Sequence, residues 1–422
     1  MKLRYIYSAC VTIETPTVRI LCDPWFTPGA DGGSWLQYPP LARPAVDVIG
    51  PTDLIYVSHI HSDHYDPLFL RTYLQRYPKA QILVGESKLK LLEKRMHLDG
   101  FTPQVVSSRN YGGTTLAIFP NRSDPLDHDT ALLVTHGEQA IVNMNDNHID
   151  EGQINAIREA CPTGRPDLAL LPYCGAGPYP QTYRFDNDTQ RDAAAARKQA
   201  QFLGYYQRYV ELLNPARAMP FAGTYVLGGP LARLNRYRGM PDATAVSSLN
   251  GCGERSIVLA DGGDAVYDLD TMTANQLRTR PYDDKAIAAY LQSIPFNGYD
   301  YEREFRPIGN RPIPIVPMVD AAQRRARAVR PSSEPWWICL KPSTGTNFIV
   351  INSKDDVPLR ITNSVTDLEP RWEIHIDDRL LFLTLTRYYH WEEVEGGSLF
   401  ASVRRPDVYR KDVEDFLYFL SI

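Results

Sequence analysis

The stretch YVSHIHSDHYD, residues 56–66, places three histidines and two aspartates at the end of the apolar run LIYV. Such a run, bounded by polar residues, predicts a short buried strand. His59 and His61 are two positions apart and face the same way in an extended chain, while Asp63 and His64 follow after a bend. Imidazole and carboxylate bind zinc, iron and manganese, and imidazole is largely neutral near pH 7. The stretch therefore predicts a metal site for one or two ions at a strand end.

The length and composition indicate a globular protein. The 422 residues are 43% hydrophobic and carry a formal net charge of −5 without a run of lysine or arginine, which argues against a nucleic-acid partner. The six cysteines form no C-x-x-C pair, so we expect free thiols and a cytoplasmic protein. We expect no membrane span, because no apolar run reaches the required ~18 residues. Residues 5–14 are expected to form a first strand instead of a signal peptide.

Strands and helices are expected to alternate along the first half of the chain. Expected strands cover 5–14, 18–25, 53–59, 80–86, 114–120, 130–146 as a hairpin, and 167–173, and expected helices cover 66–78, 87–98, 151–160 and 192–213. In the second half we expect a polar helix and linker over 319–334, strands over 336–342, 347–354, 371–377 and 379–391, and a helix over 406–420. The predicted architecture is an α/β domain over 1–318, a linker over 319–334 and a smaller α+β domain over 335–422.

The H-x-H-x-D-H pattern at 59–64 resembles the metallo-β-lactamase superfamily. The resemblance implies an αββα sandwich and a dinuclear metal site. It implies that Asp23, after an early strand, supports the metal histidines, that Asp146 bridges the two ions, and that His128 is a further ligand. Asp124 and Asp127 compete with His128 for that role.

The resemblance also implies a last histidine after a late strand, and the matching segment PFAGTYVLGGP, residues 220–230, has none. His148, two residues after Asp146, is a candidate replacement, and a solvated turn residue is the alternative. The second metal position therefore has an open ligand. His97, His136, His375 and His390 are read as structural.

Longer stretches resemble one branch, the metallo-β-lactamase-like part of CMP-N-acetylneuraminate hydroxylase. They are residues 23–41, 53–64, 129–134, 220–223 and 390–412. The Rieske ligand pairs C-x-H and C-x-x-H of that hydroxylase do not occur in the sequence. The resemblance implies an iron-dependent oxygenase, with electrons from a separate partner or with a dinuclear iron centre that uses an external reductant. We expect a small polar metabolite or a nucleotide-sugar-like molecule as the substrate, although the resemblance does not supply it.

Three functions remain open at this stage. In the oxygenase, His59, His61 and His128 hold one iron and Asp63, His64 and Asp146 hold a second. In a zinc or manganese hydrolase of a lactone, amide or phosphodiester, Asp63 or Asp146 holds a metal-bound hydroxide. The third function is metal binding without catalysis. Homo-oligomerisation is left open.

The residues expected to act on substrate lie in two loops. One covers residues 59–66 and is called the metal loop, and the other covers residues 170–185. Asp63, His64 and Tyr173 are the expected catalytic groups. Tyr179, Thr182 and Trp25 are candidates for substrate contacts, because loops carrying polar and aromatic residues at strand ends often bind ligands. Plain packing of these aromatic side chains is the alternative.

Overall fold

Two facing β-sheets form the larger part of the molecule. The computed structural model describes residues 1–122, 129–175, 177–309 and 311–422. The first sheet has the order β16 (Thr273–Ala274), β15 (Val266–Asp268), β1 (Lys2–Tyr7), β2 (Cys10–Glu14), β3 (Arg19–Cys22), β5 (Leu54–Tyr56), β6 (Gln81–Val84), β7 (Gln104–Val105). The second has the order β13 (Arg217–Phe221), β12 (Leu168–Pro172), β11 (Gln139–Asn143), β10 (Thr130–His136), β9 (Thr114–Pro120), β8 (Ser108–Tyr111).

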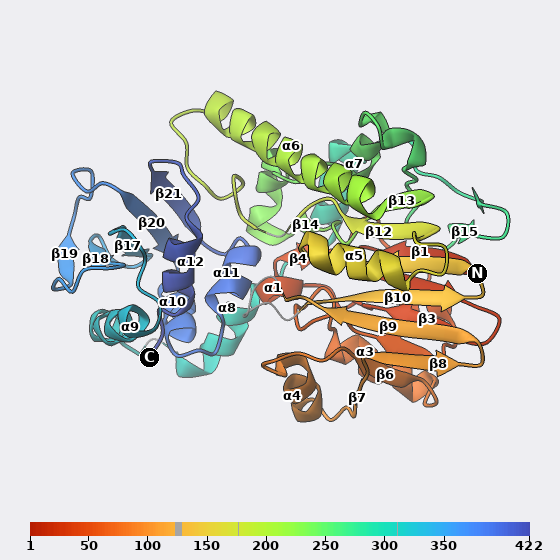
Figure 1. The fold of residues 1–422 in the computed structure, drawn as a ribbon. Helices are drawn as coiled ribbons and strands as arrows, with labels where there is room; N and C mark the ends of the chain where they lie inside the picture. The colour runs from red at the N-terminus through yellow and green to blue at the C-terminus, as the bar shows by residue number, and fades with distance from the viewer. Residues whose placement is uncertain (123–128, 176, 310) are drawn as a thin grey trace.

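Apolar side chains from both sheets fill the space between them, including Leu3, Ile13, Leu116 and Leu132. Helices α2 (Ala45–Ile49), α3 (Pro67–Arg76) and α4 (Leu91–Leu98) cover the outer face of the first sheet. Helices α5 (Glu151–Ala160) and α6 (Asp188–Leu213) cover the second sheet (Figure 1). The layers are therefore helix, sheet, sheet, helix, and the predicted αββα sandwich is confirmed.

Parallel strands bring several strand ends to one edge of each sheet. In the first sheet β3, β5 and β6 are parallel, with Cys22 opposite Tyr56. In the second sheet β11, β12 and β13 are parallel, with Asn143 opposite Leu170. Because the carboxyl ends of parallel strands lie together, residues that follow these strands meet although they are far apart in sequence.

Helix α3 begins where the metal loop ends. Asp66 caps the helix by accepting a hydrogen bond from the backbone N–H of Phe69 at 2.9 Å, and Pro67 occupies the first helical position. The same carboxylate accepts from the backbone N–H groups of Phe26 and Thr27 at 2.9 and 2.6 Å. Asp66 thus ties the segment after Asp23 to the metal loop and has a structural role.

A third sheet contains the C-terminal strands, in the order β19 (Arg360–Thr362), β18 (Phe348–Asn352), β17 (Trp337–Pro342), β20 (Arg371–Ile376), β21 (Ala401–Arg405). Packed with it are α8 (Asp300–Phe305), α9 (Ile315–Val329), α10 (Asp378–Leu385), α11 (Trp391–Gly396) and α12 (Lys411–Tyr418). Helix α9 occupies much of the expected linker and buries Val319 and Ala322 in this core, so the packing joins 319–329 to the C-terminal sheet. The division into domains stays a prediction.

The strand expected over 379–391 is wrong, because this segment contains α10 and the start of α11. Asp377 caps α10 by accepting from the backbone N–H of Arg379. Leu380, Leu381 and Leu383 are all buried, so the helix is apolar on most sides. A continuous apolar run of this length does not distinguish a buried helix from a strand.

The remaining elements connect these layers. They are α1 (Ala30–Gly33), β4 (Trp35–Leu36) paired with β14 (Val226–Leu227), and α7 (Asp284–Ser293), with 3-10 turns over 229–237, 243–248, 253–255 and 306–308. All six cysteines are buried and none forms a disulfide. Every helix in the described ranges is too short or too polar to cross a membrane.

Candidate metal centre

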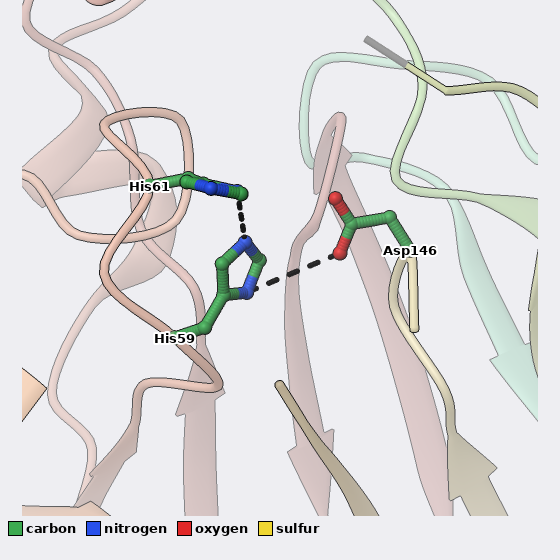
Figure 2. A group of neighbouring side chains, drawn as sticks. All are labelled: His59, His61 and Asp146. Atoms are coloured by element: carbon green, nitrogen blue, oxygen red, sulfur yellow. Dashed lines mark hydrogen bonds and ion pairs between the residues drawn. The ribbon is translucent and has the colours of Figure 1, made fainter. Parts of the chain in front are cut away.

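Two histidines from the first sheet and an aspartate from the second form a group suited to one metal ion. His59 and His61 lie in the loop after β5, and Asp146 lies after β11. One ligand atom from each side chain lies within 4.8 Å of the others. Figure 2 shows His59 between the other two: its Nε2 is 2.8 Å from Nδ1 of His61, and its Nδ1 is 3.9 Å from Oδ1 of Asp146. The two facing sheets thus bring Asp146 together with His59 and His61, from which it is far apart in the sequence.

His64 is oriented by a buried carboxylate. Asp23, which directly follows β3, is fully buried and places Oδ2 3.2 Å from Nδ1 of His64. Its Oδ1 accepts a hydrogen bond from the backbone N–H of Ser58 at 2.7 Å. A carboxylate at Nδ1 favours the tautomer with a proton there, so that Nε2 is left as a donor to a metal. The structure thus places Asp23 against His64, and its support of a metal-binding histidine stays a prediction.

Asp146 faces two sets of donor atoms. Its Oδ1 points to His59 and its Oδ2 lies 3.4 Å from Nε2 of His64. Nε2 of His64 is also 3.5 Å from Oδ2 of Asp63. Asp146 can thus serve the group with His59 and His61 and, on its other side, the group with Asp63 and His64. This arrangement suits two ions that share one carboxylate.

Burial and mutual charge shift the titration of these groups. Burial alone would raise the pKa of Asp146, but His64 and His59 outweigh it and hold that pKa well below its ordinary value. Burial would likewise lower the pKa of His64, yet Asp146 and Asp63 raise it. Burial raises the pKa of Asp63. The cluster therefore favours positive charge, either as protons on imidazole or as a bound cation.

The residues present fit a metal. Bonds of about 2.1 Å allow two donors of one ion to lie up to about 4.2 Å apart, so small side-chain rotations bring His59, His61 and Asp146 onto one ion. Nitrogen and carboxylate donors of this kind suit iron, zinc and manganese. Nδ1 of His64, the ring nitrogen that faces away from the metal position, already contacts the carboxylate of Asp23. The donor chemistry thus fits one ion at the His59 group and a second at the His64 group.

Two acidic residues at the centre were missed by the sequence analysis. Asp129, directly before β10, places Oδ1 2.9 Å from Nδ1 of His59. Glu392, in α11, places Oε1 3.6 Å from Nε2 of His61. Asp129 could have been proposed from the sequence, because it directly precedes the predicted hairpin over 130–146. Residues 390–412 take part in the family resemblance, but no pattern there predicts that the side chain of Glu392 reaches the metal centre from the C-terminal part of the chain.

The other predicted ligands are His128, with Asp124 and Asp127 as its competitors, and His148. His128 lies outside the described residues, as do Asp124 and Asp127. His148 is exposed and places Nδ1 3.3 Å from Oη of Tyr209 in α6, so it does not replace the absent late histidine.

The predicted substrate residues lie in three different surroundings. Tyr173 is buried after β12, with Oη 3.4 Å from Oγ1 of Thr224, and burial raises its pKa. Tyr179 donates a hydrogen bond to Asp407 at 2.7 Å. The carbonyl of Thr182 accepts from the backbone N–H of Ser402 in β21 at 3.1 Å. The last two therefore contact the C-terminal sheet.

Trp25 packs in a buried aromatic cluster with Tyr7 and Trp35 and donates its indole N–H to the carbonyl of Thr27 at 2.8 Å. It is 2% exposed, which is in keeping with the packing alternative. The roles of Trp25, Tyr173, Tyr179 and Thr182 toward a substrate stay predictions.

Comparison with known proteins identifies the first part of the chain. Residues 2–114 match the family model described as a beta-lactamase superfamily domain. This segment is therefore similar to a β-lactamase superfamily domain. It contains Asp23 and the whole metal loop, while Asp146 and Glu392 come from later in the chain.

Proteins similar to this chain include hydroxylases. A protein of Mycolicibacterium smegmatis, provisionally named as a Rieske 2Fe-2S iron–sulfur protein, is 27% identical over 339 residues, covering 73% of this chain and 61% of the relative. The cytidine monophosphate-N-acetylneuraminic acid hydroxylase of Asterias rubens is 27% identical over 257 residues, covering 58% and 38%. The chain thus spans less than two thirds of the length of these relatives. A solved mutant of the CmlA beta-hydroxylase is 17% identical, covering 52% of this chain and 45% of that one, with a TM-score of 0.37.

Proposed function

We propose that this protein is an iron-dependent oxygenase that hydroxylates a small polar metabolite, with a nucleotide sugar as the first substrate class to test. One observation carries the proposal: His59, His61 and Asp146 form a group of two imidazoles and one carboxylate. A metal held by such a set keeps open coordination positions, as in non-haem iron oxygenases. The hydroxylase names of the relatives support the same chemistry.

The chain's own residues have distinct roles in this proposal. His59, His61 and Asp146 would hold a first iron, and Asp63 and His64, together with Asp146, would hold a second. Asp23 fixes the ring of His64 through Nδ1. The bound iron supplies the activation of dioxygen, with electrons from a separate donor protein. A fold that supplies buried, preformed ligands keeps the site ordered before substrate arrives.

A metal-dependent hydrolase is the second candidate, and the contacts of His64 favour it. Its Nε2 lies within 3.5 Å of both Asp63 and Asp146, so the second group can hold zinc or manganese beside a bound water. A metal in such a site lowers the pKa of that water to about 7 and makes it a nucleophile. The two functions differ in their need for dioxygen.

The test compares iron-loaded and zinc-loaded protein with and without oxygen. Protein stripped of metal is loaded anaerobically, mixed with a chemical reductant and a panel of nucleotide sugars, and exposed to air or isotopically labelled dioxygen. The oxygenase predicts a product that carries labelled oxygen only with iron, and none with His59→Ala. The exposed Glu138→Gln variant, in the β10–β11 turn, is the charge control. A product formed by the zinc protein without oxygen would refute the oxygenase and favour the hydrolase.

A further inference from the structure

Helix α11, from the C-terminal part of the chain, lies against the metal loop. We propose that Glu392 is a positioning residue for His61: its carboxylate holds Nε2 so that Nδ1 points toward His59 and the metal. The two observations are the 3.6 Å separation between Oε1 of Glu392 and Nε2 of His61, and the 2.8 Å separation between Nδ1 of His61 and Nε2 of His59. The inference rests on the metal site of the proposed function.

The contact follows a pattern that the centre already contains. Asp23 lies 3.2 Å from one nitrogen of His64, and the other nitrogen of that ring faces Asp63 and Asp146. Glu392 stands in the same relation to His61, with the two ring nitrogens exchanged. Histidines that bind metals usually donate their outer N–H to a carboxylate, which fixes the tautomer and strengthens the donor nitrogen. Each half of the centre thus has its own orienting carboxylate.

Several contacts hold Glu392 in this position. Its backbone N–H donates to Nδ1 of His390, which caps α11, at 3.3 Å, and its Oε2 lies 3.7 Å from the same nitrogen. The next anchor is Trp391, which is 1% exposed and donates its indole N–H to the carbonyl of Leu420 at 2.8 Å. The first turn of α11, which carries the side chain of Glu392, is therefore held in place.

The other end of α11 is attached to the metal loop through α1. The indole N–H of Trp35 donates to the carbonyl of Gly396 at 3.0 Å, and a Cβ on Gly397 would collide with the backbone oxygen of Asp31. The carboxylate of Asp31 accepts from the hydroxyl of Ser62, in the metal loop, at 2.6 Å. The C-terminal part of the chain therefore contacts the loop directly at His61 and, through Asp31, indirectly at Ser62.

Metal binding by three variants tests the inference without any turnover. Glu392→Ala removes the carboxylate, Glu392→Gln keeps an oxygen acceptor without the charge, and Glu138→Gln is the charge-matched control. Cobalt(II) is the probe, because its visible spectrum reports the ligand geometry. Cobalt affinity is measured by competition with a chromophoric chelator, and thermal unfolding is recorded on metal-free protein.

We expect Glu392→Ala to weaken binding of one cobalt ion by about 10–100-fold and to alter its spectrum. Glu392→Gln should give an intermediate loss, because the amide oxygen can still accept from the ring N–H, and Glu138→Gln should match the parent. Unchanged affinity and spectrum in both Glu392 variants would overturn the inference. So would losses that occur only together with a lower unfolding temperature of the metal-free protein.

Failure of this inference is separable from failure of the proposed function. A parent protein that binds no cobalt would remove the metal site and with it both proposals. A parent that binds cobalt but fails the oxygen test leaves the role of Glu392 to be decided by affinity and spectrum alone.

Discussion

Replacing Asp23 separates two functions of one buried carboxylate. The side chain accepts from the backbone N–H of Ser58 at 2.7 Å and faces Nδ1 of His64 at 3.2 Å. Asp23→Ala leaves both groups without this partner in a fully buried place. Nδ1 of His64 keeps the hydroxyl of Ser58 at 3.3 Å, but the buried N–H of Ser58 loses its acceptor, so the free energy of unfolding of the metal-free protein should fall by about 1–3 kcal/mol.

Asp23→Asn should act differently. Residue 23 has a φ of 40°, which asparagine tolerates better than most residues, so the backbone is kept. The amide oxygen can still accept from Ser58, but the amide N–H₂ then faces Nδ1 of His64. That donor favours the tautomer with the proton on Nε2, which removes Nε2 as a metal donor. We expect a stability loss of about 1–2 kcal/mol and a 10–100-fold weaker second ion.

The assay combines urea unfolding of metal-free protein with a titration that counts bound ions. The control is Asp53→Asn, which changes an exposed carboxylate that accepts from the backbone N–H of Arg19 at the opposite end of β3. If Asp23→Asn bound two ions with parental affinity, the argument that Asp23 sets the tautomer of His64 would be refuted.

Two further predictions concern the centre and its surroundings. His59→Ala should abolish loading of the first ion, because it removes the nitrogen between His61 and Asp146, and metal analysis of the folded variant checks this; a metal content equal to the parent's would contradict the assignment. Burial raises the pKa of Glu395 in α11 to about 8, against about 4.5 in an unfolded chain, so its contribution favours the folded state at low pH and is lost as the pH rises from about 4.5 to 8. Glu395→Gln should therefore raise the free energy of unfolding at pH 8 by about 2–4 kcal/mol and have little effect at pH 4.5, and unfolding curves equal to the parent's at both values would show the reasoning wrong.

Local patterns predicted the alternating strands and helices and the ligand-type residues at strand ends, while the αββα sandwich was implied by the family resemblance. The strand before His59 and the strand before Asp23 are short apolar runs, and their parallel pairing brings the following residues to one edge. Asp146 follows a third such run in the other sheet. Metal-type side chains directly after buried strands are therefore readable without knowledge of the tertiary structure.

The rest depends on contacts between distant segments. Glu392 reaches His61 only because α11 docks on α1, and nothing near residue 392 indicates this. Tyr179 is a candidate for a substrate contact, and its hydroxyl donates to Asp407 because the loop after β12 joins the C-terminal sheet, which the sequence did not indicate. The misassigned helix α10 has the same cause: it is buried by tertiary packing on most sides, and its sequence shows no polar face.

The backbone pairing between residues 182–184 and Ser402 has a consequence for biosynthesis. The carbonyl of Thr182 and the N–H of Arg184 are both bonded to Ser402, at 3.1 and 2.8 Å. A ribosome makes the metal loop early but delivers Glu392 and Ser402 more than three hundred residues later. A nascent chain can therefore fold its two sheets while His61 still lacks its carboxylate partner, and the proposed metal site matures only as the last part of the chain arrives.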